Sequence, residues 1–361
     1  MTGPAAAPPP PRVRRADLER WAAAMLGAAG IPEDDAALAA RTLVRCDMRG
    51  FRTHGLARLC DYLKKIAAGE IAREAPNPPP PSAPVFTYQA GGILGQVAGP
   101  RAVDQALALA AEHPVVACQI QNSAHLGALG VNLLRAADAG CAALMFQATP
   151  PVIGAPGAKR PMIGNNPLAM VAPRPGRPAF VVDMACCVAA RGNILLAARN
   201  GEPIPEGWAL DREGEPTTDA EAALLGSLLP AGGHKGLALA MMVEILAGSL
   251  AGATFRDSLN PAGGVASGGG RLNALVLVFN PDLLQGRAAY EEHIAAWTAH
   301  YGAAGGPSAR IPGERAHEAE QAAERDGVPL PPAIIDELKA AGAGANIPFP
   351  AIERGHGPDQ Q

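Results

Sequence analysis

The sequence predicts an α/β protein whose helices are concentrated at the two ends of the chain. Between residues 84 and 279, short β-rich runs alternate with helical segments. Before residue 76 and after residue 287, helical periodicity dominates. No strand is followed by the Gly-x-Gly-x-x-Gly fingerprint of the Rossmann fold, and the P-loop, His-Glu-x-x-His and Gly-x-Ser-x-Gly motifs are also absent.

Three helices are expected before residue 76. The chain starts with a Pro/Ala-rich segment, residues 1–11, that is expected to be disordered. Apolar residues then recur at helical spacing, and Pro32 with the acids after it marks the start of a second helix, which Gly50 ends. Helices are predicted at residues 14–29, 32–48 and 59–67, and a Pro-rich connector over residues 76–84 follows them.

Strands and helices alternate beyond the connector. The predicted strands are apolar runs rich in β-branched residues, and the helices between them are longer and amphipathic. Turn residues fill the segment 207–219, and glycines fill a loop at residues 263–270. Strands are predicted at residues 84–89, 115–121, 142–147, 168–172, 179–183 and 272–279, and helices at residues 98–112, 131–139, 288–300 and 314–325.

Composition excludes several classes of function. The formal net charge is −4 and no basic cluster is long, so nucleic acid is not an expected partner. No apolar run approaches the about 20 residues of a membrane span. The start of the chain shows no hydrophobic signal core, so we expect a cytoplasmic protein. The six cysteines have neither Cys-x-x-Cys nor zinc-ligand spacing, which predicts reduced thiols and no metal site.

Residues 228–236 predict an anion-binding site. A proline and two glycines break any preceding helix, and a run of strong helix formers follows. The first turn of that helix carries His234, Lys235 and Gly236, so free backbone N–H groups, the positive end of the helix dipole and a lysine converge. This combination suits a phosphate or a carboxylate. The alternative is a glycine-rich loop that caps a core helix. Because the helix is apolar on every face except at Glu244, we expect it to be buried.

Two histidines lie in patterns that suit proton exchange. His54 follows the hydroxyl residue Thr53 and lies one helical turn before Arg58. An imidazole exchanges protons near neutral pH, and a guanidinium can grip a carboxylate with two hydrogen bonds. His125 lies at the end of an apolar strand, a favoured place for site residues in α/β sheets. The alternatives are a surface or capping role for His54 and a hydrogen-bonded turn for His125.

The segment that leaves the strand at residues 179–183 offers further candidates. Asp183 follows an apolar run and suits either a hydrogen bond to a ribose or a turn-capping role. Cys186 and Cys187 come after it, and their adjacency without metal-ligand spacing indicates small buried hydrophobic residues.

Seven stretches, taken in order and spacing, resemble the malate/L-lactate dehydrogenase family that lacks a Rossmann domain. This family includes malate, L-sulfolactate and ureidoglycolate dehydrogenases, diketogulonate reductase, and the piperideine- and pyrroline-carboxylate reductases. The resemblance covers about residues 15–340. The stretches are residues 47–58, 122–127, 164–167, 183–192, 207–219, 229–236 and 311–315.

The resemblance implies a particular domain organisation. Residues 76–307 would form a mostly antiparallel, non-Rossmann sheet domain that binds NAD or NADP. Residues 12–75 with 308–345 would form a helical cap from both chain ends, and residues 346–361 a C-terminal tail. Family members are usually homodimers, with the cleft near the subunit contact.

The resemblance also implies roles for individual residues. Thr53-His54-Gly55 matches the family's Ser-His-Gly corner, whose histidine is the proton donor in some members, while His125 matches the acid/base of others. Arg58 matches the arginine expected to hold the substrate carboxylate. Asn165 departs from the family's Gly-Thr-Asn-Pro. The implied cofactor contacts are Asp183, Met184, Ala185, Cys186, Cys187 (which replace the family's Thr-Ser), His234, Lys235, Gly236 and Arg315.

The implied function is an NAD(P)-dependent oxidoreductase. Hydride would pass between nicotinamide C4 and C2 of a small 2-oxo or 2-hydroxy acid, with His54 favoured over His125 as the proton donor. Within the enzyme class, the alternative is a cyclic imino-acid reductase that acts on Δ1-piperideine- or Δ1-pyrroline-2-carboxylate. From another class, the alternative is a non-catalytic nucleotide-binding protein on the same scaffold. The sequence leaves the choice between NAD and NADP open.

Overall fold

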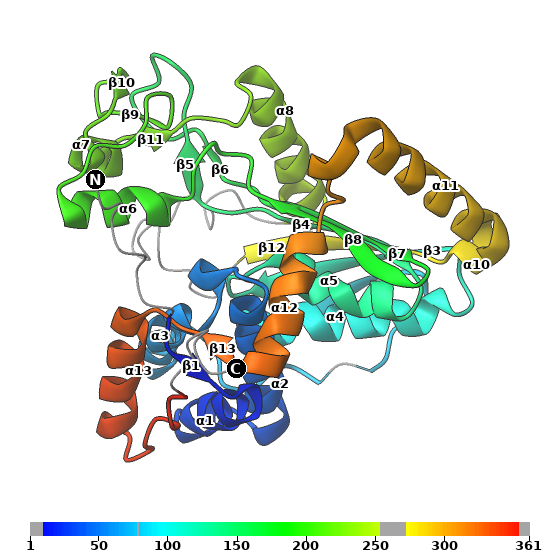
Figure 1. The fold of residues 1–361 in the computed structure, drawn as a ribbon, viewed down its shortest axis with the longest axis horizontal. Helices are drawn as coiled ribbons and strands as arrows, with labels where there is room; N and C mark the ends of the chain where they lie inside the picture. The colour runs from blue at the N-terminus through cyan, green and yellow to red at the C-terminus, as the bar shows by residue number, and fades with distance from the viewer. Residues whose placement is uncertain (1–9, 78, 253–271, 354–361) are drawn as a thin grey trace, which may run out of the picture. The chain divides into compact units, whose positions relative to one another are not determined.

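The computed structural model describes residues 10–77, 79–252 and 272–353, and the chain divides into two compact units (Figure 1). One unit consists of Met1–Glu74 and Glu314–Gln361, and the other of Ala75–Gly313. The start of the Pro/Ala-rich segment, the predicted glycine loop at residues 263–270 and the last eight residues, 354–361, lie outside the described residues.

The first unit is built from helices of both chain ends. α1 (Arg15–Ala28) packs against α2 (Glu33–Met48), which also contacts α12 (Glu314–Asp326). An antiparallel ladder between β1 (Arg12–Val13) and β13 (Val328–Pro329) joins the two ends. The 3-10 turns η1 (Arg52–His54) and η2 (Leu56–Arg58) and the helices α3 (Leu59–Ala67) and α13 (Pro332–Gly344) complete the unit.

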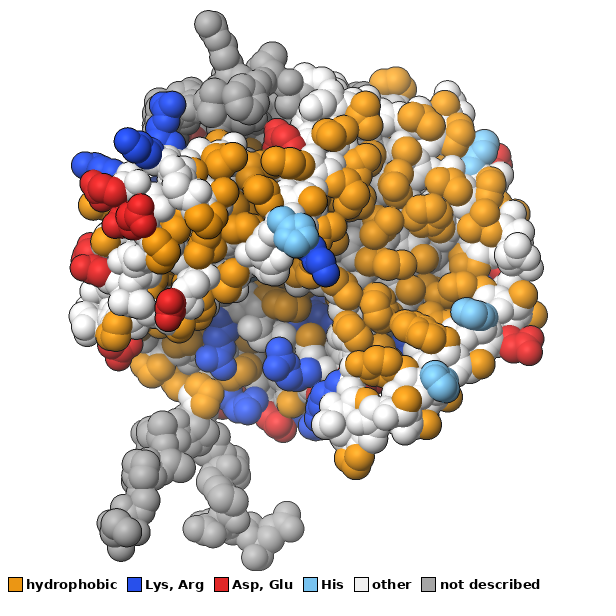
Figure 2. All heavy atoms as spheres, turned by 90° about the horizontal axis from the view of Figure 1, so that it is seen from above, with side chains coloured by type: hydrophobic (Ala, Val, Ile, Leu, Met, Phe, Trp, Pro, Cys, Tyr) orange, Lys and Arg blue, Asp and Glu red, His pale blue; other side chains and the backbone are white. Residues whose placement is uncertain are grey.

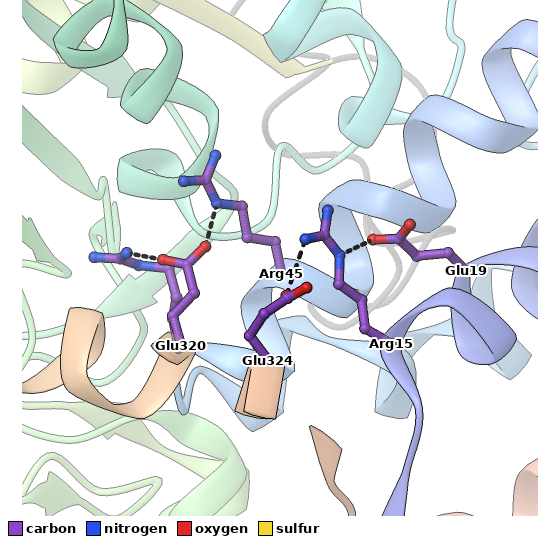
Figure 3. A network of polar contacts seen from close by, with 6 residues as sticks. Arg15, Glu19, Arg45, Glu320 and Glu324 are labelled. Carbon is purple, nitrogen blue, oxygen red and sulfur yellow. Dashed lines mark hydrogen bonds and ion pairs between the residues drawn. The ribbon is translucent and has the colours of Figure 1, made fainter. Parts of the chain in front are cut away.

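Ion pairs hold α12 to α1 and α2 (Figure 3). Glu320 of α12 accepts a hydrogen bond from Arg45 of α2 at 2.7 Å and also pairs with Arg49, directly after α2. The Arg49 side chain is only 3% exposed, so removing its partner would leave a buried charge. Arg15 of α1 reaches Glu324 at 3.0 Å, but both side chains are exposed and the pair contributes little. Glu320 is therefore the contact that fixes α12 against α2.

The last described residues pack on α1. Trp21 Nε1 donates to the carbonyl of Ile347 at 3.2 Å, and the Trp21 ring meets Phe349 edge-on with the centroids 5.0 Å apart. The Glu353 N–H donates to the Arg12 carbonyl at 2.8 Å. Residues 346–353, which the sequence assigned to a tail, therefore contribute to the first unit.

The second unit is centred on a six-stranded sheet of order β2-β3-β12-β4-β7-β8. In this sheet β2 and β3 pair in parallel, and every other neighbouring pair is antiparallel. Along β12, the fully buried Val276 and Val278 point to one face of the sheet and alternate with Leu275 and Leu277, which point to the other. Leu275 and Leu277 pack in an apolar cluster with Val243 and Ala247. Both faces of the sheet are therefore covered. The strands are β2 (Val85–Gln89), β3 (Val115–Ser123), β4 (Ala142–Gln147), β7 (Leu168–Arg174), β8 (Arg177–Met184) and β12 (Leu272–Phe279).

Helices lie on both faces of this sheet. Figure 1 shows α4 (Gly95–Ala110) and α5 (Leu129–Asp138) along one face and α8 (His234–Val243) beyond the other. α8 runs on into a π-helical turn, η3 (Glu244–Ser249), which contacts β4 and β12. After β12 come α10 (Pro281–Leu284), α11 (Arg287–Gly305) and the 3-10 turn η5 (Gly306–Ser308).

A second sheet in this unit has five short strands, in the order β10-β9-β11-β5-β6. Ile153 and Leu228 from its strands share one apolar cluster with Cys186 and Cys187. The strands are β5 (Pro151–Ile153), β6 (Ile163–Gly164), β9 (Ala209–Leu210), β10 (Pro216–Thr217) and β11 (Ser227–Leu228). Two helices in the same region, α6 (Arg191–Asn200) and α7 (Ala220–Leu225), were not predicted, because glycine and asparagine weaken the first turn of α6 and α7 is a short helix between turns.

The predicted mixed α/β class is confirmed, but one expectation about burial is wrong. The helix after residue 236 is not buried all round. Gly236, Ala240 and Val243 are its buried residues, whereas Met241 and Met242 are 47% and 43% exposed. No helix among the described residues is both long and apolar enough to cross a membrane.

Candidate functional site

The turn that carries His54 is held by a buried carboxylate. Asp47, near the end of α2, accepts a hydrogen bond from the Leu56 N–H at 2.7 Å and is 3% exposed. A Cβ at Gly55 would overlap this carboxylate, so the turn requires glycine there. Burial raises the pKa of Asp47 to about 7, against the opposing effects of the Leu56 N–H and of Arg52. Asp47 therefore fixes the backbone on the C-terminal side of His54.

Thr53, His54 and Arg58 lie together on this turn. Thr53 Oγ1 is 3.0 Å from His54 Nδ1, and Arg58 Nε donates to the Thr53 carbonyl at 3.0 Å. Burial, and after it the charge of Arg58, lowers the pKa of the half-buried His54 to about 4. The imidazole is therefore neutral near neutral pH. The bond from Arg58 uses Nε and leaves the two terminal nitrogens of the guanidinium outside it.

Three buried amides hold the backbone of His125 and Leu126. Gln147 Oε1 of β4 accepts the Leu126 N–H at 3.3 Å, and Asn132 Nδ2 of α5 donates to the Leu126 carbonyl at 3.0 Å. Gln96 Nε2 of α4 donates to the His125 carbonyl at 3.4 Å. All three side chains are almost fully buried. The position of the His125 backbone is thus set by three separate elements of the second unit.

Asp183 caps a helix. Its Oδ2 accepts the Gly130 N–H, in the first turn of α5, at 2.8 Å, where a carboxylate also interacts favourably with the helix dipole. Burial raises the pKa of Asp183 to about 6, and the Gly130 N–H opposes that rise. Because α5 follows the His125 turn, the cap links β8 to that turn. Of the two interpretations left open by the sequence, capping is observed and a ribose contact stays a prediction. Met184 is exposed and Ala185 is half-buried.

Backbone hydrogen bonds join Cys186 to two other predicted stretches. The Cys186 N–H donates to the Asn165 carbonyl at 2.8 Å, and the Ala231 N–H donates to the Cys186 carbonyl at 2.8 Å. Burial raises the pKa of both thiols to about 11. The Cys186 thiol donates to the Asn166 carbonyl at 3.2 Å. The pair is therefore buried as the sequence indicated, and Cys186 keeps a hydrogen bond where family members carry a hydroxyl.

α8 begins without a capping side chain. Gly232 and Gly233 have φ values of +63° and +64°, so the chain passes through the left-handed region just before His234. A Cβ at Gly236 would overlap the backbone of the preceding loop. Lys235 is exposed. The first turn of α8 thus combines N–H groups without a capping side chain, the positive end of the helix dipole and an exposed lysine, a combination that suits an anion such as a phosphate.

A surface pocket between α6 and α7 is a poor candidate for this site. None of the predicted site residues lines it. Its lining includes Glu202, Asp219 and Glu221, and an acidic lining disfavours both phosphate and carboxylate ligands.

The predicted site residues divide between the two units. Arg315 is exposed in the first turn of α12 and belongs to the first unit, with Thr53, His54 and Arg58. The second unit holds His125, Asp183, Met184, Ala185, Cys186, Cys187, His234, Lys235 and Gly236.

Residues that hold these turns were missed by the sequence interpretation. Asp47 lies inside the stretch 47–58 that carries the family resemblance, but an acid near a helix end is usually solvated, so its burial could not be read from the sequence. Gln96, Asn132 and Gln147 each interrupt an apolar segment. A polar residue on an apolar face was the one signal available for them, because a buried amide needs hydrogen-bond partners.

The sequence model of the malate/L-lactate dehydrogenases matches residues 13–339. The chain belongs to this family. It is accordingly an NAD(P)-dependent oxidoreductase. The family predicted from the seven stretches of sequence is thereby confirmed.

Relatives of this family member are similar over almost the whole chain. (2R)-3-sulfolactate dehydrogenase (NADP(+)) of Chromohalobacter salexigens is 38% identical over 330 residues, which cover 90% of this chain and 96% of that protein. Delta(1)-pyrroline-2-carboxylate reductase of Ancylobacter novellus is 36% identical over 339 residues, covering 92% and 98%. Among solved structures, delta1-piperideine-2-carboxylate reductase from Pseudomonas syringae superimposes with a TM-score of 0.83 at 27% identity, covering 91% of this chain and 99% of that one.

The raised pKa of Asp47 predicts a pH-dependent stability. Between the unfolded pKa of about 3.9 and the folded value of about 7, the folded state holds a proton that the unfolded state has lost. The stability that Asp47 contributes is therefore complete below the unfolded pKa and is lost as the pH rises through the folded pKa. Asp47→Asn keeps an acceptor for Leu56 but does not titrate.

We expect the free energy of unfolding of the wild type, relative to Asp47→Asn, to fall by about 2–3 kcal/mol from about pH 5 to about pH 8. Urea denaturation at both pH values measures it. Asp138→Asn, at the exposed end of α5, is the control. Parallel pH dependences for the wild type and Asp47→Asn would show that Asp47 is ionised throughout this range.

Proposed function

We propose that the protein transfers a hydride between a nicotinamide cofactor and C2 of a small 2-oxo or 2-hydroxy acid. The observation that carries this proposal is the turn on which His54 and Arg58 each lie within hydrogen-bonding distance of Thr53. It offers a proton-exchanging imidazole beside a guanidinium, and a 2-oxo acid has its carboxylate directly next to the carbonyl that needs a proton. Family membership supports the reaction type.

In this proposal each residue of the turn has a separate task. Arg58 grips the substrate carboxylate with its terminal nitrogens, while its bond to the Thr53 carbonyl fixes the guanidinium plane. His54 exchanges the proton of the C2 oxygen. Asp47 holds the backbone of the turn, so the imidazole and the guanidinium keep their spacing. His125 donates a hydrogen bond to the substrate or orients the nicotinamide.

The cofactor would be held by residues of the second unit. The nicotinamide supplies the hydride when it is bound. Lys235 and the first-turn N–H groups of α8 bind a phosphate of the dinucleotide, because no capping side chain occupies the start of the helix. The close packing of Ala231 on Gly236 holds the preceding loop against this turn. The segment from Asp183 to Cys187 lines the cofactor beside it, and Arg315 contributes a further contact. The mostly antiparallel sheet would thus bind NAD or NADP without a Rossmann fold, and the first unit would act as the helical cap.

A cyclic imino acid is the second candidate substrate. The relative from Ancylobacter novellus is named as a pyrroline-2-carboxylate reductase, and the structural match from Pseudomonas syringae as a piperideine-2-carboxylate reductase. Such a substrate also has a carboxylate next to the carbon that accepts the hydride. In that case the proton from the histidine goes to a ring nitrogen instead of an oxygen.

A substrate panel separates the two candidates. Oxidation of NADH and of NADPH is followed with pyruvate, oxaloacetate and 3-sulfopyruvate on one side, and with Δ1-pyrroline- and Δ1-piperideine-2-carboxylate on the other. We expect turnover with a 2-oxo acid at a kcat/KM well above that for either imine. Preference for an imine would transfer the proposal to the second candidate, and no oxidation with any of the five would contradict both.

The two histidines are predicted to differ in their contribution to the rate. A positioned acid or base contributes about 10²–10⁴-fold, whereas one neutral hydrogen bond is worth about tenfold. His54→Ala should therefore lower kcat at least about a hundredfold and flatten the limb of the pH–rate profile that reports the proton donor. His125→Ala should cost less and keep that limb. Protein fluorescence quenching must show that both variants still bind the cofactor. Loss of the limb in His125→Ala alone would reverse the roles.

We further propose that the enzyme is a homodimer. Figure 2 shows hydrophobic side chains gathered on the face that carries α8 and α11. Exposed apolar patches of this kind mark protein–protein contacts. The residues concerned are Met241, Met242, Ile245 and Leu250 of α8 and the turn after it, and Trp297 and Tyr301 of α11, all more than 40% exposed.

Sedimentation equilibrium tests the dimer. The wild type should sediment with twice the mass of one chain, and Ile245→Asp should shift it toward the monomer, because a charge would have to be buried in the contact. Val85→Asp, at another exposed apolar residue, on the edge strand β2, is the control. A monomeric wild type would contradict the proposal.

A further inference from the structure

Asn166 is a fully buried polar residue whose backbone lies in the left-handed region, with a φ of +34°. Its side chain makes hydrogen bonds in two directions. Nδ2 donates to the Ala240 carbonyl at 2.9 Å and to Glu244 Oε2 at 3.0 Å. Oδ1 accepts the Thr149 N–H at 2.9 Å, while the single proton of the Thr149 hydroxyl goes to Asn165 Oδ1 at 2.7 Å. The amide therefore connects the loop after β4 with the end of α8 and with the π-helical turn that follows it.

The bonds from Asn166 reach the end of α8, more than one helical turn after Lys235. Ala240 lies five residues after Lys235, which places it about 7.5 Å further along the helix axis. Glu244 is the first residue of the π-helical turn, and its side chain reaches Gly248 within the same turn, where a Cβ would lie 2.8 Å from Glu244 Oε1. π-helical turns within helices occur frequently at functional sites. Asn166 thus binds α8 where its regular hydrogen-bond pattern changes.

Hydrogen bonds to Cys186 also connect Asn165 and Asn166 with the loop before α8. The Cys186 N–H donates to the Asn165 carbonyl, and the Cys186 thiol to the Asn166 carbonyl. The Ala231 N–H donates to the Cys186 carbonyl, and the start of α8 packs on Ala231 through Gly236. Contacts therefore form a closed ring that runs from Asn166 through α8, the loop before it and Cys186 back to Asn165. A closed ring leaves the start of α8 little freedom to shift relative to the segment after β8.

We propose that Asn166 and Glu244 are a positioning pair that sets the start of α8, with Lys235, against the segment from Asp183 to Cys187. The inference rests on the proposed cofactor site and adds to it residues that would not touch the cofactor. Without the pair, the phosphate-binding N–H groups and Lys235 keep their chemistry but lose their fixed place. Cofactor affinity then falls, because binding has to order them first.

Swapping the amide of Asn166 and the carboxylate of Glu244 tests whether the two residues act as a positioning pair. Asn166→Asp keeps the acceptor for Thr149 and a residue type that tolerates positive φ, but it loses both donors and sets a carboxylate against Glu244. We expect its dissociation constant for NADH or NADPH, measured by fluorescence titration, to rise about tenfold or more, as for the loss of one or two hydrogen bonds. Glu244→Gln alone should bind almost as the wild type does. In the double variant the new amide at position 244 can donate to the new carboxylate at position 166. This restores the contact with position 244 but not the bond to Ala240, so affinity should recover part of the loss.

A matched control separates positioning from general loss of stability. Asn280 is another buried asparagine that donates to a helix carbonyl, that of Ala110 at 2.8 Å, and accepts the Asp282 N–H at 2.9 Å. Asn280→Asp should lower the melting temperature and leave the cofactor dissociation constant unchanged. In protein without cofactor, hydrogen exchange of residues 234–237 should speed up in Asn166→Asp and not in Asn280→Asp.

The outcomes distinguish this inference from the proposed function. If Lys235→Ala weakens cofactor binding while Asn166→Asp binds within about twofold of the wild type, the cofactor site stands and the positioning pair is refuted. If the wild type binds neither NADH nor NADPH, the proposed function itself fails. Should Asn166→Asp not fold, Glu244→Ala removes one of the two donor contacts and leaves the rest. An unchanged dissociation constant in that variant, together with unchanged exchange at residues 234–237, also refutes the pair.

Discussion

The candidate site depends on buried side chains that satisfy the backbone of the turns around it. A buried N–H or carbonyl in a loop has no ladder partner, and leaving it unpaired costs about 1–3 kcal/mol. Asp47 serves the His54 turn in this way, Gln147 the His125 turn, and Asn166 both Thr149 and α8. Each of these contacts has a single geometry, because a buried amide or carboxylate cannot exchange its partner for water. The same bonds that stabilise the loops therefore fix the backbone positions of the candidate site residues.

Most of the secondary structure could be predicted from the sequence, because it follows from local periodicity. β4 and β12 read as apolar β-rich runs, and the helices at the chain ends repeat apolar residues every three or four positions. The burial of α8 could not be predicted. A helix that is apolar all round is usually buried, yet Met241 and Met242 are exposed in the single chain, which is what a contact with another chain requires. The π-helical turn also has no local signal, since it depends on packing against β4 and β12.

Only part of the candidate site could be predicted from the sequence. Stretches with a recognisable order of residues predicted roles for the two histidines, Arg58 and Lys235, because polar side chains in such stretches stand out from their neighbours. The residues that hold them could not be found in the same way. Asn166 lies in the stretch 164–167 that carries the family resemblance, but its bonds to Ala240 and Glu244 span more than seventy positions in the chain. Such pairs are a property of the folded chain, and a single sequence carries no trace of which polar residues meet.

The electrostatics of the His54 turn favours an acidic substrate. Burial raises the pKa of Asp47 and lowers that of His54, so near neutral pH much of the Asp47 population is uncharged and His54 is neutral. The positive charge of Arg58 is one of the two causes of the low pKa of His54. A carboxylate bound by Arg58 offsets that repulsion, and the His54 pKa then rises toward the range in which an imidazole can carry a proton. In the proposed complex, substrate binding and protonation of His54 would therefore be linked through Arg58. A protonated His54 would then form in the complex and not in the free enzyme, where burial and Arg58 keep the imidazole neutral.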